Sequence, residues 1–101
     1  MSYSCRFHPL TQQDFDEAYI WYEDKQPGLG EKFLKAVRQK IEEIVLYPEV
    51  YGSRSSKKFR EAQVDFFPYL VVYKMNIRTE ELYICSIHPT KKHPKKKYRK
   101  E

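Results

Sequence analysis

The sequence has few cysteines, no long apolar run and no secretory leader. Cys5 and Cys85 are its two cysteines, and neither stands in a Cys-x-x-Cys or cysteine–histidine cluster. This spacing argues against a zinc site and favours two small buried apolar residues. No stretch approaches the roughly 18 apolar residues of a membrane-spanning helix, and residues 1–6 contain no apolar signal-peptide core. We therefore expect a cytoplasmic protein with no membrane segment and no disulfide framework.

The length of 101 residues is that of one domain. Apolar residues make up 41% of the chain, and the aromatic share of 16% includes nine tyrosines and six phenylalanines. Aromatic side chains supply a large buried area per residue, which suits a small sheet protein. We expect a single domain over residues 1–90, without internal repeats, followed by a basic tail over residues 91–101.

Positive charge is concentrated at the end of the chain. The net charge is +5, yet residues 91–101 contain seven cations against Glu101, while the other ninety residues contain 12 cations and 13 anions. Two interpretations of the tail stay open: a solvated extension, or a nucleic-acid contact whose affinity falls with salt. His93, Pro94 and Tyr98 interleave the lysines and favour the second, because a solubilising tail rarely needs a ring.

Apolar periodicity predicts a strand and then a helix at the start of the chain. Residues 3–8 alternate between apolar and polar side chains, the pattern of a half-buried strand, and Pro9 ends it. Thr11, with Asp14 three residues later, is typical of a helix N-cap. The following apolar residues recur at helical spacing, so we expect a helix over residues 11–25 with one face packed inward.

A second helix and three strands follow. The segment 27–30, Pro-Gly-Leu-Gly, breaks the first helix, and Pro48 ends the second, which is predicted over residues 30–47. The short break makes the two helices an antiparallel hairpin. A loop follows at residues 48–57, and β-branched and aromatic residues then predict strands at 58–66, 69–76 and 81–88. The expected fold is α+β: a small antiparallel sheet in the order β-α-α-β-β-β, with the helical hairpin packed on one face.

Three segments carry a resemblance to a known family: WYEDKQPGLG at 21–30, FPYLVVY at 67–73, and IHP at 87–89 before the lysine-rich end. In this order and spacing they resemble the RelE/ParE superfamily of toxins from bacterial type II toxin–antitoxin modules, over nearly the whole chain. The resemblance implies the same order of elements. It also implies a cleft formed by the exposed sheet face, the loop after the second helix and the C-terminal segment.

The resemblance leaves three functions open. RelE-like members cut ribosome-bound mRNA without a metal or cofactor, by attack of the ribose 2′-OH on the adjacent phosphate. ParE-like members bind and inhibit DNA gyrase and need no catalytic residues. A degenerate module, whose toxin no longer kills, is the third possibility. We take the ribosome-dependent endoribonuclease as the first hypothesis, and either active form implies a cognate antitoxin as partner.

The ribonuclease hypothesis selects four candidate catalytic residues: Arg60, His88, Lys92 and Tyr98. The reaction needs a base for the 2′-OH, an acid for the leaving oxygen, and cations for the charge that develops at phosphorus. Tyr98 matches the C-terminal tyrosine of the family and is surrounded in sequence by cations. His88 ends the last strand, where a purely structural imidazole bonded to backbone is the alternative.

Further cations are candidate nucleic-acid contacts, and one position departs from the family pattern. The contacts are Arg54, Lys57, Lys58, Lys91, Lys95, Lys96 and Lys97. Asp65 stands where ribonuclease members usually have an arginine, and a carboxylate there would repel the scissile phosphate. We expect an acidic or amphipathic segment of the antitoxin to wrap the sheet and helices and to cover the basic cleft.

Overall fold

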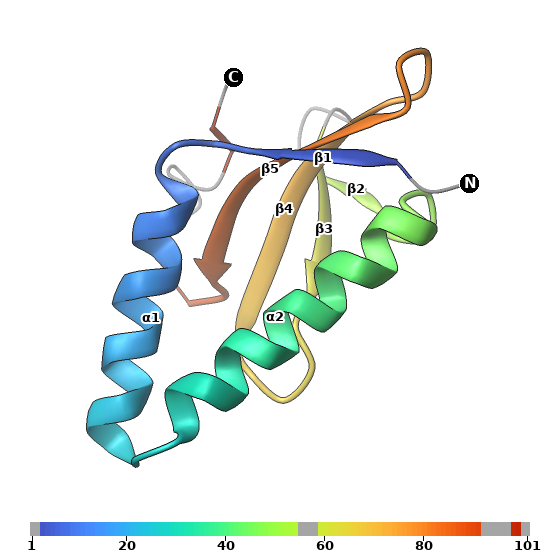
Figure 1. Ribbon diagram of the computed structural model, residues 1–101. Helices are drawn as coiled ribbons and strands as arrows, with labels where there is room; N and C mark the ends of the chain where they lie inside the picture. The colour runs from blue at the N-terminus through green and yellow to red at the C-terminus, as the bar shows by residue number, and fades with distance from the viewer. Residues whose placement is uncertain (1–2, 55–58, 92–97, 100–101) are drawn as a thin grey trace.

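The computed structural model describes residues 3–54, 59–91 and 98–99. The expected order of elements is confirmed, and the short strand β2 is added inside the segment predicted as a loop. In chain order the elements are β1 (Ser4–Phe7), α1 (Thr11–Lys25), α2 (Leu29–Leu46), β2 (Ser53–Arg54), β3 (Phe59–Gln63), β4 (Tyr69–Asn76) and β5 (Glu81–Pro89) (Figure 1).

The five strands form one sheet in the order β1-β5-β4-β3-β2. Neighbouring strands from β2 to β5 pair antiparallel, as expected. β1 pairs parallel to β5, from Ser4 opposite Glu81 to Phe7 opposite Ile84, so the sheet is mixed. The α+β class is confirmed, and the parallel pair is the one departure from the expected antiparallel sheet. It brings the first and last strands of the domain side by side.

Both helices lie on one face of the sheet (Figure 1). The main core forms between them and the sheet, because the apolar stripe of each helix must be removed from water. Neither of the helices described has the length and apolar character to cross a bilayer. The largest fully buried core side chains come from α2, from β4 and β5, and from the residue after β3: Phe33, Val37, Ile44, Val64, Val71, Tyr73, Leu82 and Ile84.

The Pro-Gly-Leu-Gly segment forms the sharp corner between the helices. Gly28 has φ = 89°, a conformation that side chains other than hydrogen disfavour. A Cβ at Gly30 would lie 2.8 Å from the ring of Tyr19. The Glu23 carboxylate accepts hydrogen bonds from the backbone N–H of Gly28 (3.0 Å) and Gly30 (2.8 Å). An acidic group thus satisfies the unpaired donors at the start of α2.

The expected N-cap at Thr11 is wrong. Leu10 occupies the N-cap position of α1, and no side chain caps the helix there. Thr11 lies inside the first turn, 1% exposed, and its Oγ1 makes no hydrogen bond with any described residue. His8 takes part of the capping role instead, since its Nδ1 accepts a hydrogen bond of 3.1 Å from the Leu10 backbone N–H.

The two cysteines pack on opposite faces of the sheet. Cys5, half-buried, contacts the main core, whereas Cys85 is fully buried in a second cluster on the other face. Both are free thiols. Burial raises the pKa of the Cys5 thiol, which makes it a poorer nucleophile.

Candidate functional site

The sheet face opposite the helices, which we call the open face, carries a cluster of its own. Phe59, Val72, Tyr83 and Cys85 are buried there, and Leu70 packs against them. An irregularity between Val72 and Tyr73 in the β4–β5 pairing leaves Cys85 as an extra residue on β5. This cluster of the open face comes from β3, β4 and β5, and the family resemblance places one wall of its cleft on the exposed face of the sheet.

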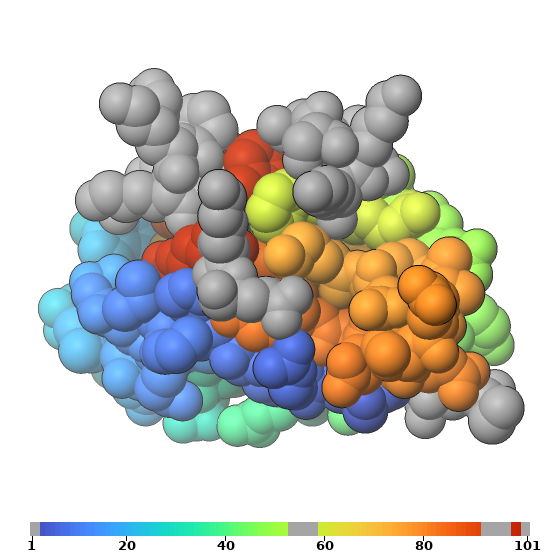
Figure 2. Space-filling model, turned by 90° about the horizontal axis from the view of Figure 1, so that it is seen from above, coloured from blue at the N-terminus to red at the C-terminus, as the bar shows by residue number. Residues whose placement is uncertain are grey.

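The end of the chain returns to the open face. The Tyr98 ring lies 4.9 Å, centroid to centroid, from that of Phe59, and the Tyr98 hydroxyl donates a hydrogen bond to the Glu61 carboxylate. Figure 2 shows the red C-terminal residues beside the yellow-green start of β3. The ring contact with Phe59 and the hydrogen bond to Glu61 fix the position of Tyr98 over β3.

Arg99 anchors this return with a two-pronged ion pair. Its Nη1 and Nη2 lie 2.8 Å and 2.9 Å from the two carboxylate oxygens of Asp14. The side chains are only 18% and 12% exposed. Asp14 also accepts a hydrogen bond of 3.0 Å from the Ile87 backbone N–H. One carboxylate therefore ties together α1, β5 and the chain end. Sequence reasoning missed this pair, because 85 residues separate its members.

His88 lies on the open face but is buried. It stands opposite Leu70 in the β4–β5 pairing, and directly paired residues share one face of a sheet. Only 6% of its surface is exposed. The structure thus brings His88 and Tyr98 to the same face, with the histidine embedded in the sheet.

Arg60 points to the other side of its strand. Successive side chains alternate between faces, and its neighbours Phe59 and Glu61 both contact Tyr98 on the open face. The Arg60 Nη1 donates to the backbone carbonyls of Tyr51 and Glu49 in the loop after α2. The structure therefore does not bring Arg60 together with Tyr98 and His88.

Asp65 also turns toward the helices. Its carboxylate lies 3.4 Å from the Lys40 Nζ of α2, and Lys40 also pairs with Glu43 at 2.9 Å. The Tyr51 hydroxyl donates to the same Glu43 at 3.0 Å. These hydrogen bonds, from Lys40 first and from Tyr51, hold the pKa of the Glu43 carboxyl below its ordinary value. The carboxylate that faces Tyr98 is Glu61, not Asp65.

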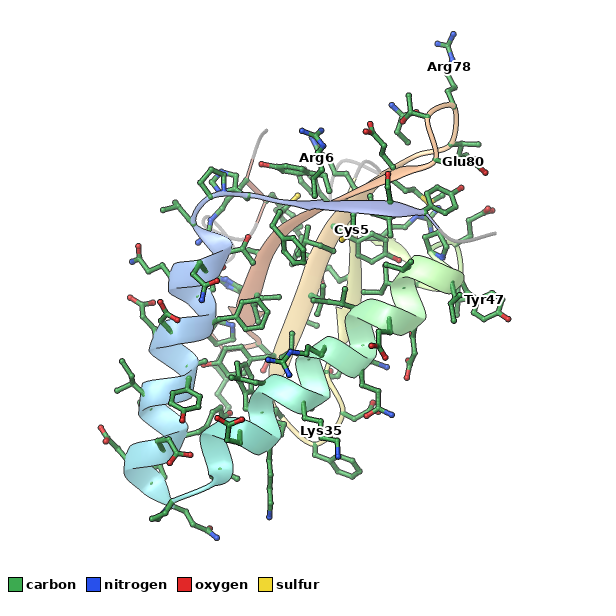
Figure 3. The ribbon with its side chains drawn as sticks, viewed as in Figure 1. Cys5, Arg6, Lys35, Tyr47, Arg78 and Glu80 are labelled. Atoms are coloured by element: carbon green, nitrogen blue, oxygen red, sulfur yellow. The ribbon has the colours of Figure 1, made fainter. Side chains whose placement is uncertain are left out.

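A basic depression of about 600 Å³ lies at the hairpin end of the open face. Four cations and one acid of the described residues line it: Arg6 from β1, Arg60 from β3, Lys74 from β4, Arg78 from the β4–β5 turn, and Glu81. The Arg6 guanidinium lies 5.4 Å from the centre of the Tyr83 ring, and the Lys74 Nζ lies 5.9 Å from it. Figure 3 shows Arg6 pointing away from both helices and Arg78 at the tip of the hairpin.

Sequence reasoning did not select Arg6 or Lys74, although one signal was available. Arg6 occupies a polar position in an alternating strand, which marks the face away from the core, and Lys74 follows the apolar run at residues 69–73. What the sequence did not reveal is that β1 pairs with β5, which brings Arg6 next to Tyr83. Cations over aromatic faces favour contact with anionic groups and bases.

The structure describes only two of the remaining candidate residues. Lys91 follows β5 and is exposed, and the backbone of Arg54 lies in β2. Within residues 3–54, 59–91 and 98–99, no group of three or more histidine, cysteine or acidic residues is arranged to hold a metal ion. The other predicted residues lie outside the described part of the chain: Lys57, Lys58, Lys92, Lys95, Lys96 and Lys97.

The sequence matches one protein family, described as the ParE toxin of type II toxin–antitoxin systems (parDE), over residues 5–94. A comparison with curated proteins yields no match.

Solved toxin structures have the same fold. The chain is similar to the chromosomal ParDE system of P. aeruginosa, with 21% identity, a TM-score of 0.65 and coverage of 89% of this chain and 98% of that one. For the isolated RelE toxin of E. coli, the identity is 14% and the TM-score 0.67, with coverage of 91% of this chain and 88% of that one. For the RelBE2 toxin–antitoxin complex of Mycobacterium tuberculosis, the identity is 17% and the TM-score 0.64, with coverage of 88% of this chain and 99% of that one. At these identities the likeness establishes the fold alone.

Proposed function

We propose that this chain, which belongs to the ParE toxin family of type II toxin–antitoxin systems, stops growth by binding DNA gyrase and not by cutting RNA. Its binding surface is the open face of the sheet. This reverses the order in which the sequence alone ranks the two hypotheses. The protein acts in the cytoplasm, where gyrase and its DNA are found.

The positions and hydrogen bonds of the candidate catalytic residues support this proposal. The Tyr98 hydroxyl donates its hydrogen bond to the Glu61 carboxylate. Arg60 donates to the backbone carbonyls of Glu49 and Tyr51 and lines the basic depression, whose lining, among the described residues, does not include Tyr98 or His88. An in-line phosphoryl reaction needs its acid, base and cation at one reacting centre. Within the described residues, the open face has a binding surface and lacks that convergence.

The cations of the basic depression suit a target that is bound to DNA. Arg6 and Lys74 border the Tyr83 ring, and Arg78 extends the positive surface along the hairpin. A surface of this kind attracts phosphates and acidic side chains at distances up to the Debye length.

A supercoiling assay with purified gyrase tests the proposal. We expect the wild-type chain and Tyr98→Phe to inhibit supercoiling equally, because the substituted ring keeps the contact with Phe59. The double variant Arg6→Ala/Lys74→Ala should require at least about tenfold more protein, since it loses two cations from the contact surface. Full supercoiling at every concentration of the folded wild-type protein would rule out gyrase as the target.

The ribonuclease remains the second candidate, because His88 and Tyr98 share one face of the sheet. In that case, binding of RNA would have to displace Glu61 from the Tyr98 hydroxyl. Primer extension on cellular mRNA would then show cuts in cells that express the wild-type chain. Tyr98→Phe should remove those cuts while leaving the protein folded.

The partner that restrains this toxin is a cognate antitoxin. Two of the similar structures are described as toxin–antitoxin systems or complexes, which supports such a partner here. An acidic or amphipathic antitoxin segment fits the positive open face. We expect the complex to weaken as salt is raised, in proportion to the charges that the segment pairs.

A further inference from the structure

The basic depression draws its charge from separate elements of the fold. Its cations are Arg6 of β1, Arg60 of β3, Lys74 of β4 and Arg78 of the β4–β5 turn. Glu81 is the only acid among the described residues of its lining, so four positive charges stand against one negative charge. Its volume of about 600 Å³ lies in the range of ligand-binding pockets. The depression thus has the size and the charge of a site for an anion with several charged groups.

Two buried aromatic rings support cations of the depression. The Arg6 guanidinium lies 5.4 Å from the centre of the Tyr83 ring, and the Lys74 Nζ lies 5.9 Å from the same centre. The Lys74 Nζ is also 5.6 Å from the centre of the Phe59 ring. Tyr83 and Phe59 are only 7% and 9% exposed, so both cations lie on the solvent side of the rings. Attraction to the rings restricts the two side chains before a ligand arrives, which lowers the entropy lost on binding.

Hydrogen bonds within the β4–β5 turn fix the place of Arg78. The Asn76 Oδ1 accepts hydrogen bonds from the backbone N–H of Arg78 (3.0 Å) and of Thr79 (3.3 Å). The Thr79 hydroxyl donates to the Glu81 carboxylate at 3.1 Å, which ties the acid of the lining to the turn. Figure 3 shows Arg78 at the hairpin tip, well apart from Arg6. The positive charge is therefore held at several points and is not gathered at one.

Helix α1, on the other layer of the molecule, has the opposite charge. Its ionisable side chains are five acids and one base: Asp14, Asp16, Glu17, Glu23, Asp24 and Lys25. Both helices cover the sheet face that lies away from the depression (Figure 1). The field of the molecule therefore favours the approach of a polyanion to the open face and opposes its approach to α1.

We propose that the basic depression is a binding site for linked phosphate groups. Three of its four cations are arginines, whose planar fork donates two parallel hydrogen bonds to the oxygens of one phosphate. Because Arg6 and Arg78 stand apart, they suit successive phosphates of a chain better than a single ion. Arg60 adds charge to the site while its Nη1 stays bonded to the carbonyls of the loop after α2.

Two ligands share this chemistry, the sugar-phosphate backbone of DNA and a free nucleoside triphosphate. The backbone is the ligand that we expect, because the proposed target holds DNA. The inference thus rests on the proposed function for the source of the phosphates. It adds that the protein contacts DNA directly, through this depression, and does not depend on gyrase for that contact.

Fluorescence anisotropy of a labelled duplex DNA, measured with the purified full chain and without gyrase, tests the site. We expect binding that weakens as salt is raised, with inorganic tripolyphosphate as a competitor and adenosine as none. Lys74→Gln and Arg78→Gln should each reduce the slope of log affinity against log salt by about 0.9, because each removes one phosphate contact.

Glu81→Gln is the variant that separates binding from damage to the fold. It removes the acid of the lining, so the affinity for DNA should rise about twofold, and a misfolded protein would not bind more tightly. Lys35→Gln and Arg38→Gln are the matched controls, since each removes an exposed cation from α2. Both should leave the salt slope as it is in the wild type.

Equal salt slopes for the wild type, Lys74→Gln and Arg78→Gln would overturn the phosphate site. Stronger competition by polyglutamate than by tripolyphosphate would also overturn it, because the depression would then prefer an acidic protein segment.

Two further measurements identify the ligand and separate this inference from the proposed function. Tighter binding of duplex DNA than of ATP is expected, and binding of ATP without DNA would contradict the backbone as the ligand. Inhibition of supercoiling by a chain that binds neither DNA nor tripolyphosphate would overturn the phosphate site and leave the gyrase proposal intact. Binding of DNA without inhibition of supercoiling would overturn the gyrase proposal and leave the phosphate site intact.

Discussion

Asp14 is the residue on which the end of the chain depends. Its carboxylate pairs with Arg99 and also accepts the Ile87 N–H. It lies in the first turn of α1, where a negative charge is favoured by the helix dipole. The Arg99 ion pair, the Ile87 hydrogen bond and the helix dipole thus stabilise one largely buried charge. Because Arg99 directly follows Tyr98, its ion pair with Asp14 also holds the Tyr98 ring near Phe59.

The substitution Asp14→Asn should destabilise the protein by about 2 kcal/mol, because Arg99 then remains largely buried without its counter-charge. Urea unfolding followed by circular dichroism gives the change in free energy. Asp16→Asn is the matched control: this exposed acid bonds to Gln12 one turn earlier, and its loss should cost no more than about 0.5 kcal/mol.

Arg99→Met provides the second test of this pair. Added to Asp14→Asn, it should cost little more, since the partner is already gone. If the two losses of free energy simply add, the residues do not act as a pair and the anchoring role is refuted.

Single residues also show where sequence reasoning ends. The sequence alone pointed to Tyr98 as a candidate functional residue of the tail, because it interrupts a run of lysines. Its bond to Glu61, 37 residues away, was not accessible, because it depends on how the tail crosses the sheet. Thr11 was misassigned as a cap for a similar reason: His8 accepts the Leu10 N–H after β1 has placed it there.

At the scale of elements, the helix corner follows directly from the sequence. Gly30 lies close to the Tyr19 ring, and Glu23 bonds to two N–H groups at the start of α2. The segment WYEDKQPGLG therefore determines the corner between the helices. Its glycines allow the tight backbone, and its glutamate caps the start of α2. This explains why the segment is informative about the fold and says little about the target.

Gly30→Ala should lower the free energy of unfolding by about 1–2 kcal/mol, because its Cβ would meet Tyr19 and Glu23 within 3 Å. Thermal unfolding is a suitable measurement. The same substitution made together with Tyr19→Ala should cost clearly less. An undiminished penalty in that background would show that the ring is not the obstacle.

A contact between α2 and the loop that follows it should make the stability of the protein depend on pH. Lys40 and Tyr51 bond to Glu43 and lower the pKa of its carboxyl. A depressed pKa contributes stability above the unfolded value of about 4.3 and loses it as the pH falls through the folded value. The contribution should stay below about 1 kcal/mol, because the pair is partly exposed.

Glu43→Gln isolates this contribution. The variant should be less stable than the wild type at pH 7, and the difference should shrink as the pH falls from about 5 to about 3. Urea midpoints at these pH values give the comparison. A difference that stays constant over this range would contradict the assignment.

The elements themselves were largely predictable, and their pairing was not. The helix predicted over 11–25 is observed at Thr11–Lys25, and that over 30–47 at Leu29–Leu46. Apolar periodicity contains this information, because it reports which face each element buries. The parallel contact of β1 with β5 joins the two ends of the domain, from Ser4 opposite Glu81 onward, so no local pattern reports it.

At the scale of the whole molecule, two surfaces of different character lie on opposite layers. The open face has Arg6 and Lys74 over aromatic rings, and the helical side has a largely apolar recess between α2 and the β3–β4 turn, with the exposed Phe66 at its edge. A helical hairpin over one sheet face produces this division, because it leaves the other face available for a target.

The decisive measurement for gyrase binding by the open face is growth arrest after induction of Tyr98→Phe, compared with Arg6→Ala/Lys74→Ala in the same strain. We expect full arrest with Tyr98→Phe, intact cellular mRNA by primer extension, and loss of arrest when the two cations are removed. Loss of arrest with Tyr98→Phe, together with mRNA cuts that only the wild type makes, would contradict it.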